Sequence, residues 1–379
     1  MKYILSGGGT GGHIYPALAI GEEIKKQDKE AKILYVGKKN SLEEELAKKY
    51  GFDFQGIDVS GLPRKKINKD TVITFFNLMK GLKECTKILD NFKPDIVIGT
   101  GGYVCAPIVF KAQQKKIKTA IQEQNAYPGK TNKILAKKAD YVFINFMEAK
   151  KYLNNDNIIF TGNPIREVFS HLDRQKSRDA LKIKKDEKFV FSFGGSGGQE
   201  STNDAILEIL NKKEKLPFKL THVTGRDHYD YFMGKLGEVP ENVEILDYTH
   251  KVYDYLSSAD LVIASSSAMT LAEISAIGIA SILIPKAYTA GNHQYYNAMS
   301  YSNMGASSVI EEENLNGDTL LDGIEKILNK DEDRKLMADN SKKLASPDAV
   351  SKIVEILLKW FYEKDGKEKK KKEKKRKKK

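Results

Sequence analysis

A histidine at the edge of a glycine-rich loop is the first residue of the chain whose type and setting could do chemistry. The stretch SGGGTGGHIYPALAI (6–20) follows the apolar run YIL and places five glycines and a threonine just before His13. Glycines let a backbone approach a ligand closely, and an imidazole titrates near neutral pH. The stretch could therefore hold an anion and move a proton. The alternative is that His13 only caps or packs the start of a helix.

Two further glycine-rich loops follow apolar runs, GTGGYVCAP (99–107) and FGGSGGQES (193–201). One such loop alone is often a tight turn between a strand and a helix. A helix N-terminus behind the loop presents unpaired N–H groups and partial positive charge, which favour an anion. Three loops of this kind predict an anionic ligand, and we expect a diphosphate in the crevice between two sheets.

The first loop also matches the dinucleotide-binding pattern G-x-G-x-x-G through Gly7, Gly9 and Gly12. That site needs an acidic residue at the end of the second strand to hold a ribose, whereas this strand ends in LYVGKKN. No Lys-Ser or Lys-Thr pair follows the glycines, as a P-loop would require. These features argue against a nicotinamide enzyme.

Two polar stretches leave their roles open. In SSSAMTLAEISAIG (265–278), Thr270 and Glu273 have the spacing of a helix capping box, or Glu273 accepts hydrogen bonds from ribose hydroxyls. In GNHQYYNA (291–298), His293 and Gln294 could donate hydrogen bonds to sugar hydroxyls, or the loop is simply solvated.

The elements that must position these residues are strands alternating with helices. The first set of strand-like runs is YILSGGG, KILYVG, DIVIGTGG, TAIQEQN and YVFIN, and the second is FVFSFGG, KLTHVTG, VEILDY, DLVIASSS and ASILIP. Such alternation predicts parallel sheets with helices on both faces. We expect two doubly wound domains with a boundary near residues 163–166. A last helix with an apolar stripe is predicted over 346–364, capped by Ser346.

The basic charge is concentrated at one end of the chain. The 379 residues carry a net charge of +12, and residues 364–379 hold twelve Lys or Arg against three acidic residues, so they account for +9. Such a run predicts a disordered tail. It favours an anionic lipid surface over nucleic acid, since no base-reading motif accompanies it, and we expect no nucleic-acid partner.

Other global features point to a cytoplasmic protein. The two cysteines, Cys85 and Cys105, have no spacing that suggests a disulfide framework or a zinc site. No run of about eighteen apolar residues predicts a membrane span. The opening MKYIL is too short for the apolar part of a signal peptide.

Seven motifs in order give a more specific indication. GGTGGHIYPALAI, GTGGYVCAP, QEQNAYPG, TGNPIR, FGGSGG, AMTLAE and NHQYYNA closely resemble those of the MurG family, the N-acetylglucosaminyltransferases of bacterial peptidoglycan synthesis. The motifs extend from Gly8 to Ala298, and the two-sheet pattern extends the resemblance to about residue 363.

The resemblance implies an α/β protein of the GT-B fold, with two Rossmann-like parallel-sheet domains facing a cleft. It implies transfer of N-acetylglucosamine from UDP-GlcNAc to the 4-hydroxyl of the muramoyl sugar of lipid I, which forms lipid II with inversion at the anomeric carbon. The resemblance also implies that this reaction takes place at the cytoplasmic face of the cell membrane. It implies a peripheral protein with no cofactor and no metal site. The DED sequence at 331–333 matches D-x-D literally, but we expect a solvated helix face there.

The implied domain organisation has four parts: an N-terminal acceptor and membrane-side domain (1–163), a UDP-GlcNAc-binding domain (164–346), a helix returning to the first domain (347–363) and the basic tail (364–379).

Carried over motif by motif, the resemblance makes His13 the best candidate for general base and adds Glu123 as a second catalytic residue. The implied substrate-binding residues are Thr10, Gly11, Gly12, Tyr103, Asn125, Arg166, Ser196, Leu246, Ala268, Met269, Thr270, Leu271, Ala272, Glu273, His293 and Gln294. Two positions depart from the family pattern. Gln122 replaces a histidine before EQN, and Ser265 replaces an arginine before the AMTLAE segment.

An anionic membrane surface is expected to contact residues 64–79. The segment combines a basic cluster with an apolar face, made of Arg64, Lys65, Lys66 and Lys69 beside Val72, Phe75, Phe76 and Met79. The alternative is a core helix preceded by a charged loop. For the whole chain, the alternatives are a UDP-GlcNAc epimerase, a GT-B transferase with another acceptor, and a non-catalytic binder of nucleotide-sugar or nucleic acid.

Overall fold

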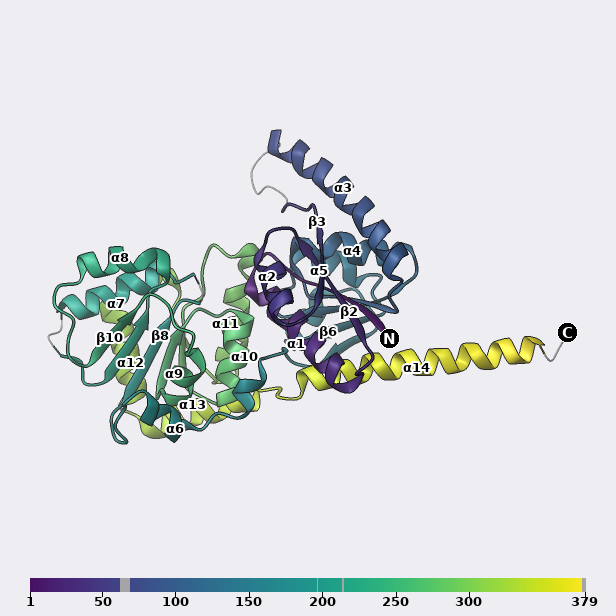
Figure 1. Cartoon of the computed structure of the whole chain (residues 1–379). Helices are drawn as coiled ribbons and strands as arrows, with labels where there is room; N and C mark the ends of the chain where they lie inside the picture. Colours follow the sequence, from purple (N-terminus) through teal and green to yellow (C-terminus); the bar gives the residue numbers. More distant parts are fainter. Residues whose placement is uncertain (62–68, 196, 213–214, 377–379) are drawn as a thin grey trace.

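The computed structural model describes residues 1–61, 69–195, 197–212 and 215–376. It has two lobes, each a sheet with helices against both faces (Figure 1). Every strand pair among the described residues is parallel. The α/β prediction of two parallel-sheet domains is therefore confirmed.

The N-terminal sheet has seven strands in the order β3-β2-β1-β4-β5-β6-β7. Its strands are β1 Lys2–Ser6, β2 Lys32–Lys38, β3 Asp53–Ile57, β4 Ile96–Gly99, β5 Lys118–Glu123, β6 Tyr141–Ile144 and β7 Ile158–Phe160. Its helices are α1 Gly11–Gln27, α2 Leu42–Lys49, α3 Lys69–Phe92, α4 Gly102–Gln114, α5 Lys130–Ala136 and the 3-10 helix η1 Met147–Tyr152.

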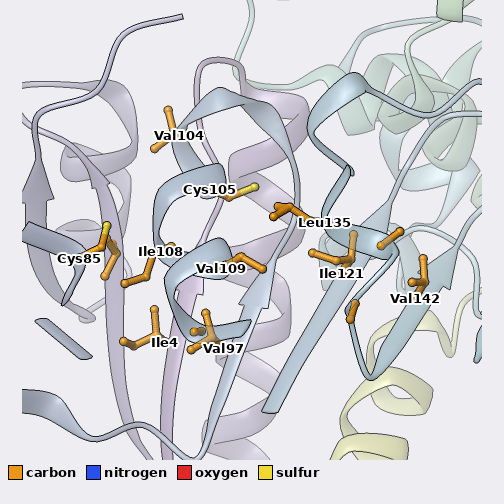
Figure 2. Close-up of a cluster of buried hydrophobic side chains, with 14 of the residues drawn as sticks. Ile4, Cys85, Val97, Val104, Cys105, Ile108, Val109, Ile121, Leu135 and Val142 are labelled. Atoms are coloured by element: carbon orange, nitrogen blue, oxygen red, sulfur yellow. The ribbon is translucent and has the colours of Figure 1, made fainter. Parts of the chain in front are cut away.

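The central strands of this sheet are apolar because both of their faces are buried, as parallel sheets require. Ile4 points into one cluster under α3 and α4, whereas Tyr3 and Leu5 point into a second cluster under α1. Figure 2 shows the first cluster, in which Val97 and Ile121 of neighbouring strands lie beneath α4. Cys85 and Cys105 are free thiols buried in the same cluster.

The C-terminal sheet has six strands in the order β10-β9-β8-β11-β12-β13. Its strands are β8 Phe189–Phe193, β9 Lys219–Val223, β10 Val243–Leu246, β11 Leu261–Ala264, β12 Ser281–Leu283 and β13 Ser308–Val309. Its helices are η2 Glu167–Ser170, α6 Arg174–Ala180, α7 Glu200–Lys212, α8 Arg226–Lys235, α9 Val252–Ser258, α10 Ala268–Ile277, η3 Ala290–Asn292, α11 His293–Asn303, η4 Glu312–Asn314, α12 Gly317–Leu328 and α13 Asp331–Lys343.

The last helix, α14 (Ala349–Arg376), packs on the N-terminal domain. Ile353, Val354 and Leu357 are fully buried in the cluster that also holds Tyr3 and Leu5. Figure 1 shows α14 crossing beneath this domain and continuing beyond it. The boundary expected near residues 163–166 falls in the irregular segment between β7 and η2.

Two expectations about this helix are wrong. It begins at Ala349, three residues after Ser346, and the tail expected to be disordered is helical as far as Arg376. A packed helix is already nucleated, and lysine is a good helix former, so the segment adds turns without a new nucleation cost.

Within the described ranges, no helix is both long and apolar enough to cross a bilayer.

Candidate active site

The candidate site lies where the carboxyl ends of the two sets of strands meet. His13 is in the first turn of α1, directly after the glycine loop that follows β1. Its Nδ1 lies 3.0 Å from the hydroxyl of Thr10, and its backbone oxygen accepts a 2.6 Å hydrogen bond from the hydroxyl of Thr100 after β4. These contacts fix a half-buried imidazole at the sheet edge.

The first two glycine loops interlock around this histidine. Gly101 and Gly102 have φ values of +108° and +76°, which favour glycine. A Cβ on Gly102 would lie 2.1 Å from the backbone oxygen of Gly8, and one on Gly101 would lie 2.5 Å from Cδ2 of His13. The glycines of GTGG are therefore required for the packing of the first loop and its histidine.

The setting of His13 favours its neutral form. Burial and, to a smaller extent, the positive charge of His293 together lower the pKa of His13 to about 4. His293 begins α11 in the other domain, where its Nδ1 lies 3.0 Å from the backbone oxygen of Ala290. The two histidines are thus close enough to interact across the domain boundary, and His13 is free to accept a proton at neutral pH.

Glu123, the second predicted catalytic residue, contacts the loop that follows β5. It is buried at the end of β5, and its carboxylate accepts hydrogen bonds from the N–H groups of Asn125 and Gly129 and from the side-chain amides of Asn125 and Asn132. Burial raises the pKa of Glu123, and these four donors oppose the rise. A carboxylate engaged by four donors has no free lone pair for a substrate. The catalytic role of Glu123 stays a prediction, and in this structure its carboxylate holds loop 124–129.

Arg166 and Glu273 form an ion pair of 3.0 Å between the interdomain segment and α10. Burial raises the pKa of Glu273, and the cation of Arg166 partly offsets that effect. The capping-box alternative for Thr270 and Glu273 is wrong, because α10 already begins at Ala268. Its N-cap is Ser267, whose hydroxyl accepts from the N–H of Thr270.

The third glycine loop packs against the strand ends of the C-terminal domain. A Cβ on Gly198 would lie 2.0 Å from the backbone oxygen of Thr224, and the hydroxyl of Ser265 donates to the oxygen of Gly194. Ser196, predicted to bind phosphate, lies outside the described residues.

Lys286 is a candidate that the motifs did not indicate. The half-buried ammonium donates a 2.6 Å hydrogen bond to the backbone oxygen of Gly198 in the third loop. Burial lowers the pKa of Lys286, and the carboxylate of Glu312 partly offsets that effect. The ammonium of Lys286 thus places a positive charge beside the third loop. Ser265, which replaces an arginine of the family pattern, supplies none. The signal in the sequence was the place of Lys286 three residues after the end of β12, in LIPK.

The remaining predicted residues divide between the domains. Tyr103 lies over the first loop, with its ring 3.2 Å from a Cβ built on Gly9. Gln294 is buried, and its side-chain oxygen accepts from the N–H of Lys286. Leu246 ends β10 half-buried, and its backbone oxygen accepts from the N–H of Thr224.

The first turns of α10 supply the other predicted contacts, Ala268, Met269, Thr270, Leu271 and Ala272. Leu271 is fully buried in the domain core, so its side chain cannot touch a ligand. Met269 accepts a 3.1 Å hydrogen bond at its sulfur from the amide of Asn163, which in turn accepts from Gln122. Gln122, which departs from the family pattern, therefore contributes to the contact between the domains.

The D-x-D match is part of the first turn of α13. Asp331 is exposed and pairs with Lys188 at 2.6 Å and Arg334 at 2.9 Å. Among the described residues, no group of three or more His, Cys, Asp or Glu side chains is placed to hold a metal ion.

The expected membrane segment, residues 64–79, lies mostly outside the side chains that the structure describes. Residues 62–68 and the side chains through residue 77 lie outside the described part of the chain. The backbone from Lys69 onward forms the first turns of α3, which project from the body of the domain (Figure 1). Met79 is exposed, with 44% of its surface accessible.

Two parallel-sheet domains with glycine loops at their strand ends have the architecture of the GT-B fold. The sequence profile of the glycosyltransferase family 28 N-terminal domain matches residues 3–144, and that of the C-terminal domain matches residues 189–353. The chain belongs to this family and, within it, to the MurG family of hexosyltransferases, as its seven motifs predicted.

Relatives that share one name match this chain along nearly their whole length. The UDP-N-acetylglucosamine–N-acetylmuramyl-(pentapeptide) pyrophosphoryl-undecaprenol N-acetylglucosamine transferase of Finegoldia magna is 46% identical over 362 residues, covering 94% of this chain and 97% of that protein. The enzyme of the same name from Clostridioides difficile is 41% identical over 367 residues, covering 95% and 89%.

Solved structures support the fold. The crystal structure of Acinetobacter baumannii MurG has a TM-score of 0.75 at 23% identity, covering 94% of this chain and 99% of that one. A UDP-GlcNAc 2-epimerase from Neisseria meningitidis bound to UDP-GlcNAc has a TM-score of 0.64 at 14% identity, covering 95% and 100%. The two are related to this chain by fold.

Proposed function

We propose that this hexosyltransferase moves N-acetylglucosamine from UDP-GlcNAc to the 4-hydroxyl of the muramoyl sugar of lipid I, forming lipid II in peptidoglycan synthesis. The observation that carries the proposal is the imidazole of His13, held between two interlocked glycine loops and close to His293 of the other domain. A neutral imidazole at a strand-end site suits a reaction whose nucleophile is a hydroxyl.

His13 acts as the general base. When its Nδ1–H donates to the hydroxyl of Thr10, Nε2 carries the lone pair that accepts the proton of the acceptor hydroxyl. The acceptor oxygen forms its bond to the anomeric carbon as the bond from that carbon to the diphosphate breaks. The electron pair leaves with UDP, and a single displacement of this kind inverts the anomeric carbon.

Cationic and N–H groups of the chain stabilise the leaving diphosphate. Arg166 is held by Glu273, Lys286 lies beside the third glycine loop, and α7 begins directly after that loop. Fixed donors aimed at developing negative charge lower the barrier without reorganising. We propose that this set acts without a metal ion, and that Glu273 also accepts hydrogen bonds from the ribose.

The enzyme works peripherally at the cytoplasmic face of the membrane, where lipid I is anchored. Residues 64–79, with Met79 exposed, provide the contact with anionic lipid, and the basic segment 364–379 adds attraction. Nucleic acid is not a partner in this proposal.

The test measures UDP release from UDP-GlcNAc with a lipid I analogue in the presence of EDTA. Wild type is expected to release UDP only with the acceptor. His13→Ala is expected to lose about a hundred- to ten-thousand-fold in kcat while UDP binding persists. His171→Ala is the matched control, because His171 is an exposed histidine at the C-terminal end of η2. Turnover that survives in His13→Ala returns His13 to a structural role. Absence of acceptor-dependent release while UDP-GlcNAc binds favours an epimerase.

A further inference from the structure

A fully buried asparagine on α11, Asn297, joins the two domains. Its Oδ1 accepts a 2.8 Å hydrogen bond from the backbone N–H of Ala126 in the N-terminal domain. Its Nδ2 donates at 3.1 Å to the side-chain oxygen of Asn125 and at 3.1 Å to the backbone oxygen of Ser266. One side chain therefore contacts the segment after β5 and the segment after β11.

On the N-terminal side, Glu123 also holds the loop that Asn297 contacts. The same Asn125 that accepts from Asn297 donates to Glu123 through its backbone N–H and its side-chain amide. Glu123 also fixes the N–H of Gly129 at the far end of the loop. Loop 124–129 thus has two anchors, one within its own domain and one in the other.

On the C-terminal side, Asn297 contacts the turn that leads into α10. Ser266 precedes the helix that carries Glu273, and its hydroxyl donates a 2.7 Å hydrogen bond to the backbone oxygen of Gln294. The turn, α10 and the start of α11 are the segments proposed to hold the donor. Asn297 is therefore hydrogen-bonded directly to the segments proposed to hold UDP-GlcNAc and to the loop on the side of the lipid I substrate.

Aromatic packing supports the same contact between the two domains. The ring of Tyr127 in the N-terminal loop stacks on Tyr296, the neighbour of Asn297, with 5.2 Å between ring centroids. A Cβ on Gly291 would lie 2.9 Å from the ring of Tyr127, so η3, which leads into α11, approaches the loop closely.

We propose that Asn297 is a positioning residue that couples the donor segments of the C-terminal domain to loop 124–129, so that nucleotide binding orders the acceptor side. This inference rests on the proposed function. A buried amide that loses a partner leaves polar groups unsatisfied, so the turn at Ser266 and the loop at Asn125 keep one relative geometry. A ligand that fixes the turn therefore also fixes the loop, and the coupling is reciprocal.

The test is hydrogen exchange of the peptide covering residues 124–129, with and without UDP. In wild type, UDP is expected to slow exchange at Ala126 by about fivefold or more, the lower range of ordinary coupling energies. In Asn297→Ala, UDP is expected to bind within about threefold of wild type, yet leave this exchange unchanged. Asn303→Ala is the matched control, the same substitution at an exposed position on the same helix.

Kinetics give a second readout that loss of folding would not mimic. Asn297→Ala is expected to lower kcat and raise KM for the lipid I analogue with little change in KM for UDP-GlcNAc. Combined with Asn125→Ala, the losses in kcat are expected to be non-additive, because both changes break one contact. If Asn297→Ala does not fold, Asn297→Asp replaces it in both experiments. The aspartate keeps the oxygen that accepts from the N–H of Ala126 and lacks the amide group that donates to Asn125 and Ser266.

Several outcomes overturn the inference: no effect of UDP on loop exchange in wild type, an undiminished effect in Asn297→Ala, or additive losses with Asn125→Ala. Loss of UDP binding together with activity in a folded Asn297→Ala protein also overturns it. A wild type in which UDP slows loop exchange, but which shows no acceptor-dependent UDP release, overturns the proposed transferase and leaves the coupling in place.

Discussion

The guanidinium of Arg166 lies 3.0 Å from the carboxylate of Glu273, and this ion pair connects the interdomain segment to α10. Arg166 is partly exposed, whereas Glu273 is nearly buried, so the pair has one side open to a ligand. In the proposed complex the cation faces the diphosphate and the carboxylate faces the ribose. The pair then orients both groups before the donor arrives, which lowers the cost of ordering them on binding.

The role of Glu273 can be tested with a nucleotide that lacks a hydroxyl. Glu273→Gln is expected to weaken UDP binding by about tenfold or more, because hydrogen bonds to a charged acceptor are worth roughly 1.5–3 kcal/mol. Wild type is expected to discriminate against 2′-deoxy-UDP, and the variant to lose much of that discrimination. Titration calorimetry with both nucleotides measures this. Equal discrimination in the two proteins would assign Glu273 to holding Arg166 alone.

The pH dependence of turnover reports on His13. Because the pKa of His13 is lowered to about 4, its neutral form persists down to that pH. With His13 as base, kcat/KM for the acceptor is expected to stay nearly level from pH 8 to about pH 5 and to fall only as pH approaches 4. An acidic limb near pH 6.5 that His13→Ala abolishes would show a histidine with its ordinary pKa in the free enzyme.

The interlocked glycine loops predict a sharp contrast between two substitutions. Gly102→Ala places a Cβ 2.1 Å from the oxygen of Gly8 at a φ of +76°, so we expect a loss of about 3 kcal/mol or more in unfolding free energy. Gly129→Ala has nothing within 4 Å and a φ of −62°, so we expect a change within about 0.5 kcal/mol. Denaturant unfolding of both variants measures the difference, and similar stabilities would contradict the interlock.

The membrane contact is tested by Phe75→Ser combined with Phe76→Ser. Removing two apolar rings from a basic interfacial segment is expected to release the protein from anionic vesicles and lower turnover of membrane-bound lipid I, while UDP binding is kept. Vesicle sedimentation and calorimetry measure the two properties. Unchanged partition to anionic vesicles would rule out this contact, and recovery of turnover on a soluble acceptor analogue would support it.

The sequence predicts the strands well because a parallel strand buried on both faces must be almost wholly apolar, as β4 and β11 are. It predicts the glycine loops because backbone conformation there excludes side chains. The contacts of Glu123 were not predictable, since its four donors are set by how the chain turns after β5. The pairing of Asn125 with Asn297 joins residues 172 positions apart, and neither has a periodic signal.

Because α14 completes the core of the N-terminal domain, the C-terminal domain is an insertion within it. During synthesis, Tyr3 and Leu5 leave the ribosome long before Ile353 and Leu357, which cover them. The inserted domain can finish folding while its host still exposes an apolar strip. Truncation before α14 is therefore expected to damage the domain at the opposite end of the sequence and to leave the neighbouring one folded.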